Sequence, residues 1–218
     1  MCFSATASFV TAGLTGAVAI ACLVRAGGPR DLLLAATPAV FAVQQGVEGL
    51  LWLTLPVAPE GSASTALTLL FLLVAEVFWP LYAPLAALLI ETDPRRRRMI
   101  GLCLAAGGAV AAWLAWAIAT RSHGAIVQDG HIVYLTEQEP SVLVAAAYLA
   151  ATSLSLLLSS RRAVTMLGVL VLVGSVTAYF YYWEAFVSVW CFFAAAASVV
   201  ILGHFEWSHR QRLRSIGA

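Results

Sequence analysis

The sequence contains no lysine, and charged residues of either sign are scarce. Only 11% of its 218 residues are charged, against about a quarter in a typical soluble domain, whereas 61% are hydrophobic and the mean hydropathy is +0.90. A chain with so little charge cannot cover itself with a hydrated surface, which points to the bilayer as its solvent. The absence of lysine also excludes a retinal protein of the rhodopsin kind, because that chemistry needs a Schiff-base lysine.

Zinc-binding spacings and a basic surface are also lacking. The four cysteines form neither a CxxC pair nor a Cys/His zinc pattern. The net charge is +1, so nucleic acid is not expected as a partner. The N-terminus has no basic region of the signal-peptide kind, and we expect the first apolar run to remain as a helix.

Apolar runs make up most of the chain. About 20 mostly apolar residues cross the hydrocarbon core of a bilayer as a helix, and seven segments meet this requirement. They are approximately residues 5–26, 31–55, 64–90, 99–120, 141–159, 163–183 and 184–204. The sequence therefore predicts an all-α integral membrane protein, in which residues 1–218 form a single domain of seven transmembrane helices.

The arginines predict the orientation of these helices. Positive residues favour the cytoplasmic side of a membrane. Along a seven-span path, every arginine except Arg121 falls on one side. We therefore expect the N-terminus outside and the C-terminus in the cytoplasm. The use of arginine alone is associated with GC-rich bacterial genomes, so the expected location is a bacterial cytoplasmic membrane.

The segment 121–140, between the fourth and fifth helices, predicts a short extracytoplasmic β-hairpin. Asp129-Gly130 separates two runs of β-favouring residues, and this dipeptide is a strong signal for a two-residue hairpin turn. The hairpin would lie over the helix bundle. The alternative is a well-formed loop without a functional role.

Two acidic residues lie inside predicted membrane helices. Ionisable groups in a bilayer are costly and are functional candidates for that reason. Glu48 lies in the second helix and Glu76 in the third, at similar depths because the two helices run in opposite directions. Pro80, four residues after Glu76, removes a backbone hydrogen bond and crowds the carbonyl of Glu76, which favours a kink there.

These residues predict a polar pocket that opens to the outer face. Its floor would consist of Gln44, Gln45, Glu48 and Glu76. Its walls would be formed by the aromatic residues Trp52, Trp79, Tyr82, Tyr179 and Tyr182. Its rim would carry Cys2, Cys191 and His131, a donor set that suits a transition metal such as zinc, copper or iron. The alternative is a buried polar network that locks the helices together, with Cys191 a structural thiol and His131 a solvated loop residue.

Three motifs carry a resemblance over essentially the whole chain. They are MCFSA at residues 1–5, QQxxEGxxW at 44–52 and SVWCFF at 188–193. Together they resemble an uncharacterised, domain-of-unknown-function family of bacterial polytopic membrane proteins. The resemblance implies a membrane location and a bacterial source, and it supplies no activity.

Three functions remain open at this point. The first is binding or transport of a small ligand, ion or metal in the pocket of Glu48 and Glu76. The second is a membrane enzyme, with metal dependence left open, that acts on a lipid or an extracytoplasmic substrate. The helix number is similar to that of zinc-dependent membrane hydrolases related to alkaline ceramidase, but their His and Asp ligand pattern is not matched. The third is a sensory or assembly subunit that binds a protein partner or a second copy of the chain.

Overall fold

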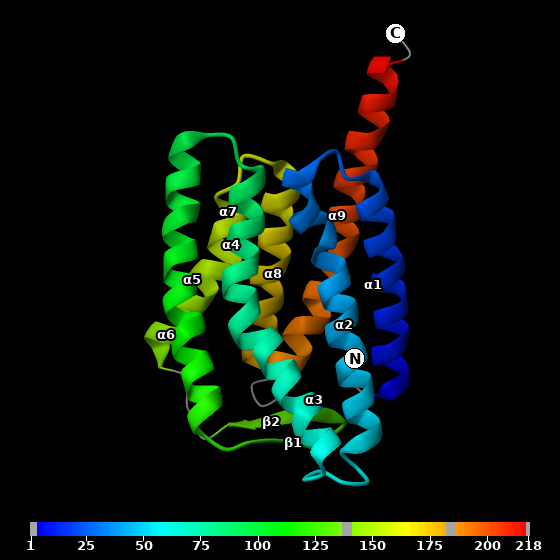
Figure 1. Ribbon diagram of the computed structural model, residues 1–218, viewed down its shortest axis with the longest axis vertical. Helices are drawn as coiled ribbons and strands as arrows, with labels where there is room; N and C mark the ends of the chain where they lie inside the picture. The colour runs from blue at the N-terminus through cyan, green and yellow to red at the C-terminus, as the bar shows by residue number, and fades with distance from the viewer. Residues whose placement is uncertain (1–3, 137–140, 182–185, 217–218) are drawn as a thin grey trace.

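The computed structural model describes residues 4–136, 141–181 and 186–216, and it describes side chains in these ranges except at 186–194, 196 and 216. Within this part of the chain, helical rods run up and down between two ends, and a hairpin covers one end (Figure 1). The elements are α1 (Ala5–Arg25), η1 (Pro29–Asp31), α2 (Leu32–Thr54), α3 (Ser62–Leu72), η2 (Leu73–Phe78), α4 (Trp79–Ile90), α5 (Pro94–Thr120), β1 (His123–Gln128), β2 (His131–Thr136), α6 (Val142–Leu149), η3 (Ala150–Leu154), α7 (Ser155–Leu157), α8 (Arg162–Tyr181) and α9 (Phe186–Ile216).

Several of these helices suit a bilayer. The helices that are long and apolar enough to cross one are, among the described residues, Ala5–Arg25, Ser62–Ile90, Pro94–Thr120 and Arg162–Tyr181. The segment Val142–Leu157 is a shorter apolar helix. The predicted mainly helical fold with one small hairpin is thus confirmed, and its apolar helices fit a membrane protein.

Two helices extend beyond the limits that hydropathy predicts. α5 begins at Pro94 rather than near residue 99, because Asp93 accepts hydrogen bonds from two backbone N–H groups of the first turn. α9 continues to Ile216 rather than ending near residue 204. Beyond its apolar part, Glu206 pairs with Arg210 one turn later, at 2.9 Å. Arginines expected in loops therefore lie on regular helix turns.

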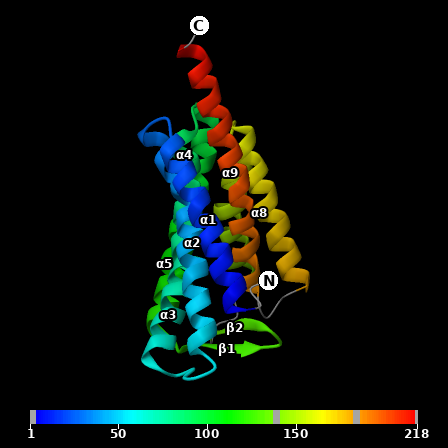
Figure 2. The same cartoon turned by 90° about the vertical axis from the view of Figure 1, so that its right-hand side faces the viewer.

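The arginine-rich segments meet at one end of the bundle. The α1–α2, α4–α5 and α7–α8 turns and the C-terminal part of α9 lie together at the top of Figure 1, and Figure 2 shows the same end from the side. Arg25 Nε lies 2.6 Å from Glu206 Oε2, which joins α1 to α9. Arg96 donates to the carbonyl of Leu158 at 2.8 Å, which joins α5 to the α7–α8 turn.

A buried carboxylate holds this end together. Glu91, directly after α4, is 2% exposed and accepts hydrogen bonds from the N–H groups of Thr92, Asp93 and Ser160 at 2.8, 3.0 and 2.6 Å. The hydroxyls of Ser159 and Ser160 add two more, at 3.3 and 2.8 Å. Burial by itself raises the pKa of Glu91, but these hydrogen bonds outweigh burial and lower the pKa to about 2. The turns α4–α5 and α7–α8 are thereby fixed to each other.

The opposite end carries the predicted hairpin. β1 and β2 pair antiparallel around Asp129 and Gly130, whose φ angles of 49° and 74° are those of a type I′ turn. Ile132 is fully buried, and Tyr134 stacks on Phe71 of α3 with ring centroids 4.5 Å apart. The hairpin therefore packs on the bundle as a structural cover, because its side chains contribute to the core.

Two π-helical segments, η2 and η3, interrupt helical rods in the middle of the bundle. The hydroxyl of Tyr148 on α6 donates to the carbonyl of Ala75 in η2, so the two rods are joined at this level.

Helices α4 and α5 approach each other closely at Gly107. Pro84 has no N–H to bond the carbonyl of Pro80, so this carbonyl is not covered within α4. A Cβ on Gly107 of α5 would lie 1.9 Å from the Pro80 carbonyl oxygen. The glycine is required for this close approach.

Candidate functional site

A hydrogen bond between two helices lies at the centre of the candidate site. Trp79 Nε1 donates to Gln44 Oε1 at 2.9 Å, which joins α4 to α2. The indole also stacks on Phe41, one turn before Gln44, with centroids 4.1 Å apart and planes at 21°. Both partners of the bond are buried, at 3% and 1% exposure. These contacts fix the position of α2 relative to α4 at the level of Gln44 and Trp79.

Glu48 lies one turn beyond Gln44 on α2, toward the hairpin end. Its side chain is completely buried, and Oε2 accepts a hydrogen bond from Gln45 Nε2 at 3.1 Å. Gln45 is 1% exposed. Burial of a charged carboxylate costs free energy unless the group is hydrogen-bonded and paired. A fully buried glutamate in a membrane helix is therefore a candidate functional residue.

Glu76 lies in the π segment η2, one turn before Trp79. The rod α3–η2–α4 runs opposite to α2, so Glu76 and Glu48 both lie on the hairpin side of the Gln44–Trp79 bond. The side chain of Glu76 is half-buried rather than fully buried. Single-turn π segments inside α-helices are frequent at functional sites.

Some buried polar atoms of α1 and α2 have no hydrogen-bond partner among the described residues. Gln45 Oε1 and Trp52 Nε1, both on α2, are buried and have no hydrogen-bond partner among the described residues. The same holds for the hydroxyl of Ser8 on α1, a side chain with no exposed surface. Phe9, the residue after Ser8, packs its ring against Gly49, the residue after Glu48. Buried polar atoms without partners are rare and require an explanation.

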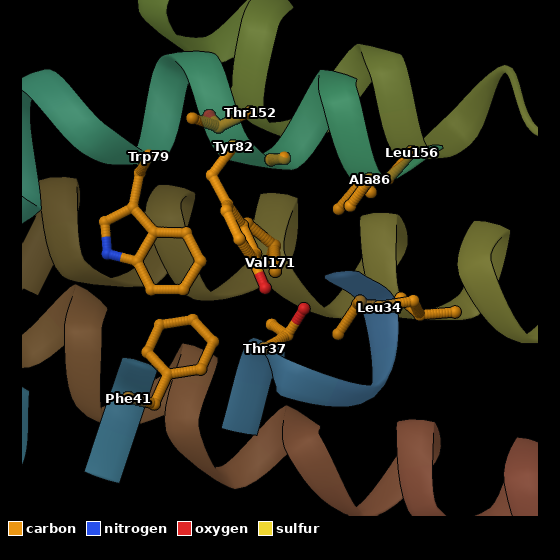
Figure 3. Close-up of a pocket in the computed structure, with 11 residues that line it drawn as sticks. Leu34, Thr37, Phe41, Trp79, Tyr82, Ala86, Thr152, Leu156 and Val171 are labelled. Carbon is orange, nitrogen blue, oxygen red and sulfur yellow. The ribbon is translucent and has the colours of Figure 1, made fainter. Parts of the chain in front are cut away.

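A cavity of about 30 Å³ lies on the other side of Trp79, toward the arginine-rich end. Trp79 and Tyr82 line it, together with mostly apolar side chains of α2, α4, α7 and α8 and with Thr152 of η3 (Figure 3). Figure 3 shows the hydroxyls of Tyr82 and Thr37 pointing toward each other, and the Tyr82 hydroxyl donates to the carbonyl of Leu33 at 2.5 Å. Glu48 and Glu76 are not among its lining residues, so this cavity is distinct from the surroundings of the two glutamates.

The other predicted residues are distributed as follows. Tyr179, on α8, is 52% exposed. His131 begins β2 at the hairpin end. Cys2, Tyr182 and the side chain of Cys191 lie outside the described residues. The predicted metal set of Cys2, Cys191 and His131 therefore stays a prediction, as does the aromatic wall formed by Tyr179 and Tyr182.

No group of three or more His, Cys, Asp and Glu side chains lies close enough to hold a metal ion within the described parts of the chain.

A sequence model of a family of unknown function, DUF6629, matches residues 1–216. The chain belongs to DUF6629. No curated protein and no solved structure matches the chain. Membership in DUF6629 confirms the resemblance to a family of unknown function and leaves the activity to be argued from the site.

Sequence reasoning missed two kinds of residue. It did not single out Ser8, whose buried hydroxyl has no partner, because a lone serine in an apolar helix is common. It also missed the Tyr148–Ala75 contact and the π segments, although Pro80 predicted a kink in the same rod. Gln44, Gln45 and Glu48 were predictable because polar residues in an apolar run are conspicuous.

Proposed function

We propose that this DUF6629 protein spans the bacterial cytoplasmic membrane seven times, with its N-terminus outside and its C-terminus in the cytoplasm. The support is the collection of the arginine-bearing turns at one end of the bundle, while Arg121 lies at the other. Reporter fusions test this orientation. A cytoplasm-active fluorescent protein on the C-terminus should fluoresce, and a periplasm-active phosphatase inserted after Asp129 should be active. The reverse pattern contradicts the proposal.

We further propose that the protein binds, or carries across the membrane, a small ion, metal or polar ligand at Glu48. The observation that supports this most is the fully buried carboxylate of Glu48 on a helix whose Gln45 Oε1 and Trp52 Nε1 are buried without partners among the described residues, as is Ser8 Oγ on the adjacent α1. A network whose purpose was only to lock the helices would satisfy its own polar atoms, since each unpaired buried group costs about 1–3 kcal/mol. A bound ligand would supply the missing partners.

The chemistry of these groups indicates the class of ligand. A carboxylate, an amide oxygen and a hydroxyl are hard oxygen ligands, which suit a cation such as a proton, a metal ion or an ammonium group. The Trp52 N–H adds one donor for a polar ligand atom. Glu76, at the same depth on the adjacent rod, offers a second carboxylate. Both glutamates lie in the half of the bundle near the hairpin, which is the outer half in the proposed orientation.

The test is a binding and uptake measurement on the purified full chain. We expect metal analysis or proton-driven uptake into vesicles to show a signal that Glu48→Gln reduces at least about tenfold, because one charged ligand is lost. The matched control is Glu60→Gln, an exposed carboxylate in the α2–α3 turn, which should leave the signal unchanged. Equal signals in the wild type, Glu48→Gln and Glu76→Gln would contradict the proposal.

A further inference from the structure

The arginine-rich end contains a hollow that the proposed function does not use. Its volume is about 440 Å³, and it opens where η1, the α7–α8 turn and the end of α9 meet. Its lining residues include Arg161, His204, Ser208 and Arg212, together with Asp31 and with Phe205, which is 1% exposed. Two guanidinium groups, an imidazole and a hydroxyl thus face one space.

The two arginines differ in how they are held. Arg212 donates to the carbonyl of Arg25 and lies against Gly27, so its position is set by the α1–α2 turn. Asp31 accepts a hydrogen bond from the Gly27 N–H at 3.1 Å and lies on the same side of that glycine. The carboxylate that lines the hollow is therefore engaged by the backbone of its own turn.

Of the two arginines that line the hollow, Arg161 is the one that makes no hydrogen bond through its guanidinium among the described residues. Its guanidinium has no hydrogen bond or ion pair in the part of the chain described, where the ion pairs of Glu206 are with Arg25 and Arg210. It lies close enough to His204 to act on that ring electrostatically. With Arg161 and Arg212 positive and Asp31 negative, the hollow keeps a net positive charge even when His204 is neutral.

We infer that this hollow binds a phosphate group, carried either by the headgroup of an anionic phospholipid or by a free phosphate compound. Phosphate has the oxygen acceptors that two guanidinium groups, an imidazole N–H and a serine hydroxyl satisfy together. Basic pockets between membrane helices on the cytoplasmic side are a known way to hold phospholipid headgroups. The volume exceeds that of phosphate alone and leaves room for a glycerol unit.

The test uses the purified full chain in a maltoside detergent with three soluble probes. These are dihexanoyl phosphatidylglycerol, inorganic phosphate and dihexanoylglycerol, which has the acyl chains without the phosphate. We expect the phosphatidylglycerol to bind and Arg161→Gln to weaken it about tenfold, because a charge-assisted contact is lost. Arg162→Gln is the matched control, since the adjacent arginine does not line the hollow, and should change affinity by less than about twofold.

The remaining arms separate the sources and can overturn the inference. Displacement of the lipid by inorganic phosphate indicates a free phosphate site, whereas lipid binding that phosphate does not displace indicates a headgroup site. Ser208→Ala, which leaves all charges in place, should also weaken binding. Equal weakening by Arg161→Gln and Arg162→Gln, or equal binding of dihexanoylglycerol, would mean that the hollow does not recognise phosphate.

Discussion

Glu48 and Glu91 are both buried carboxylates of an apolar bundle, and the protein treats them in opposite ways. Glu91 accepts five hydrogen bonds, from backbone and hydroxyl groups of two turns. Glu48 accepts a hydrogen bond from Gln45, and Gln45 Oε1 and Trp52 Nε1 on the same helix are buried without a partner among the described residues. A carboxylate whose donors are all supplied by the fold is a structural clasp, whereas one with unsatisfied neighbours marks a place for a ligand.

The largest effect on stability is expected for Glu91→Ala. The substitution leaves five donors without their acceptor in a buried turn, and each unpaired group costs about 1–3 kcal/mol, so a total loss of about 3 kcal/mol or more is expected. Thermal unfolding in detergent measures it. Glu60→Ala, on an exposed turn, is the control and should be close to neutral. A stable Glu91→Ala variant would refute the structural role of this carboxylate.

Acidification should remove the same contribution gradually. The pKa of Glu91 is about 2 in the fold and 4.5 ordinarily, so its stabilisation is complete above pH 4.5 and is lost as the pH falls toward 2. The shift corresponds to about 3 kcal/mol. Unfolding of the wild type and of Glu91→Gln, compared from pH 6 to pH 2, should show a stability difference that shrinks in that window. A constant difference would assign the acid sensitivity to other groups.

Two serine variants make the smallest and sharpest comparison. Ser160→Ala removes one of the donors to Glu91 and should cost about 1 kcal/mol. Ser8→Ala removes a buried hydroxyl that has no partner among the described residues and should leave stability unchanged or raise it by about 0.5 kcal/mol. The same Ser8 variant should weaken ligand binding at Glu48. Destabilisation by Ser8→Ala equal to that by Ser160→Ala would mean that both serines are structural.

The features that sequence reasoning predicted depend on neighbours along the chain. The hairpin follows from Asp129-Gly130, since both residues must adopt positive φ angles for a type I′ turn. The helical rods follow from apolar runs of sufficient length. Gln44, Gln45 and Glu48 stood out because polar groups are rare in such runs. Each signal is contained in a short segment, so a single sequence suffices to detect it.

The features that it missed depend on residues far apart in the chain. Glu91 is bonded by Ser159 and Ser160, 68 and 69 residues away, and alone it resembles any acidic residue at a helix end. The partner of Arg212 is the carbonyl of Arg25, 187 residues away. The π segments also depend on the packing of η2 and η3 against α5, which the local sequence does not specify.

By itself, the sequence determined that this chain is a bundle of apolar helices with its arginines partitioned to one end and its polar side chains grouped on α2 and η2. Hydropathy and turn propensity are properties of short segments, so they can be recognised from the sequence without a structure. Only the tertiary structure decided which polar groups are satisfied and which are left over, because a hydrogen bond in the core requires two partners from separate helices to meet within about 3 Å. That distinction separates the clasp at Glu91 from the candidate site at Glu48.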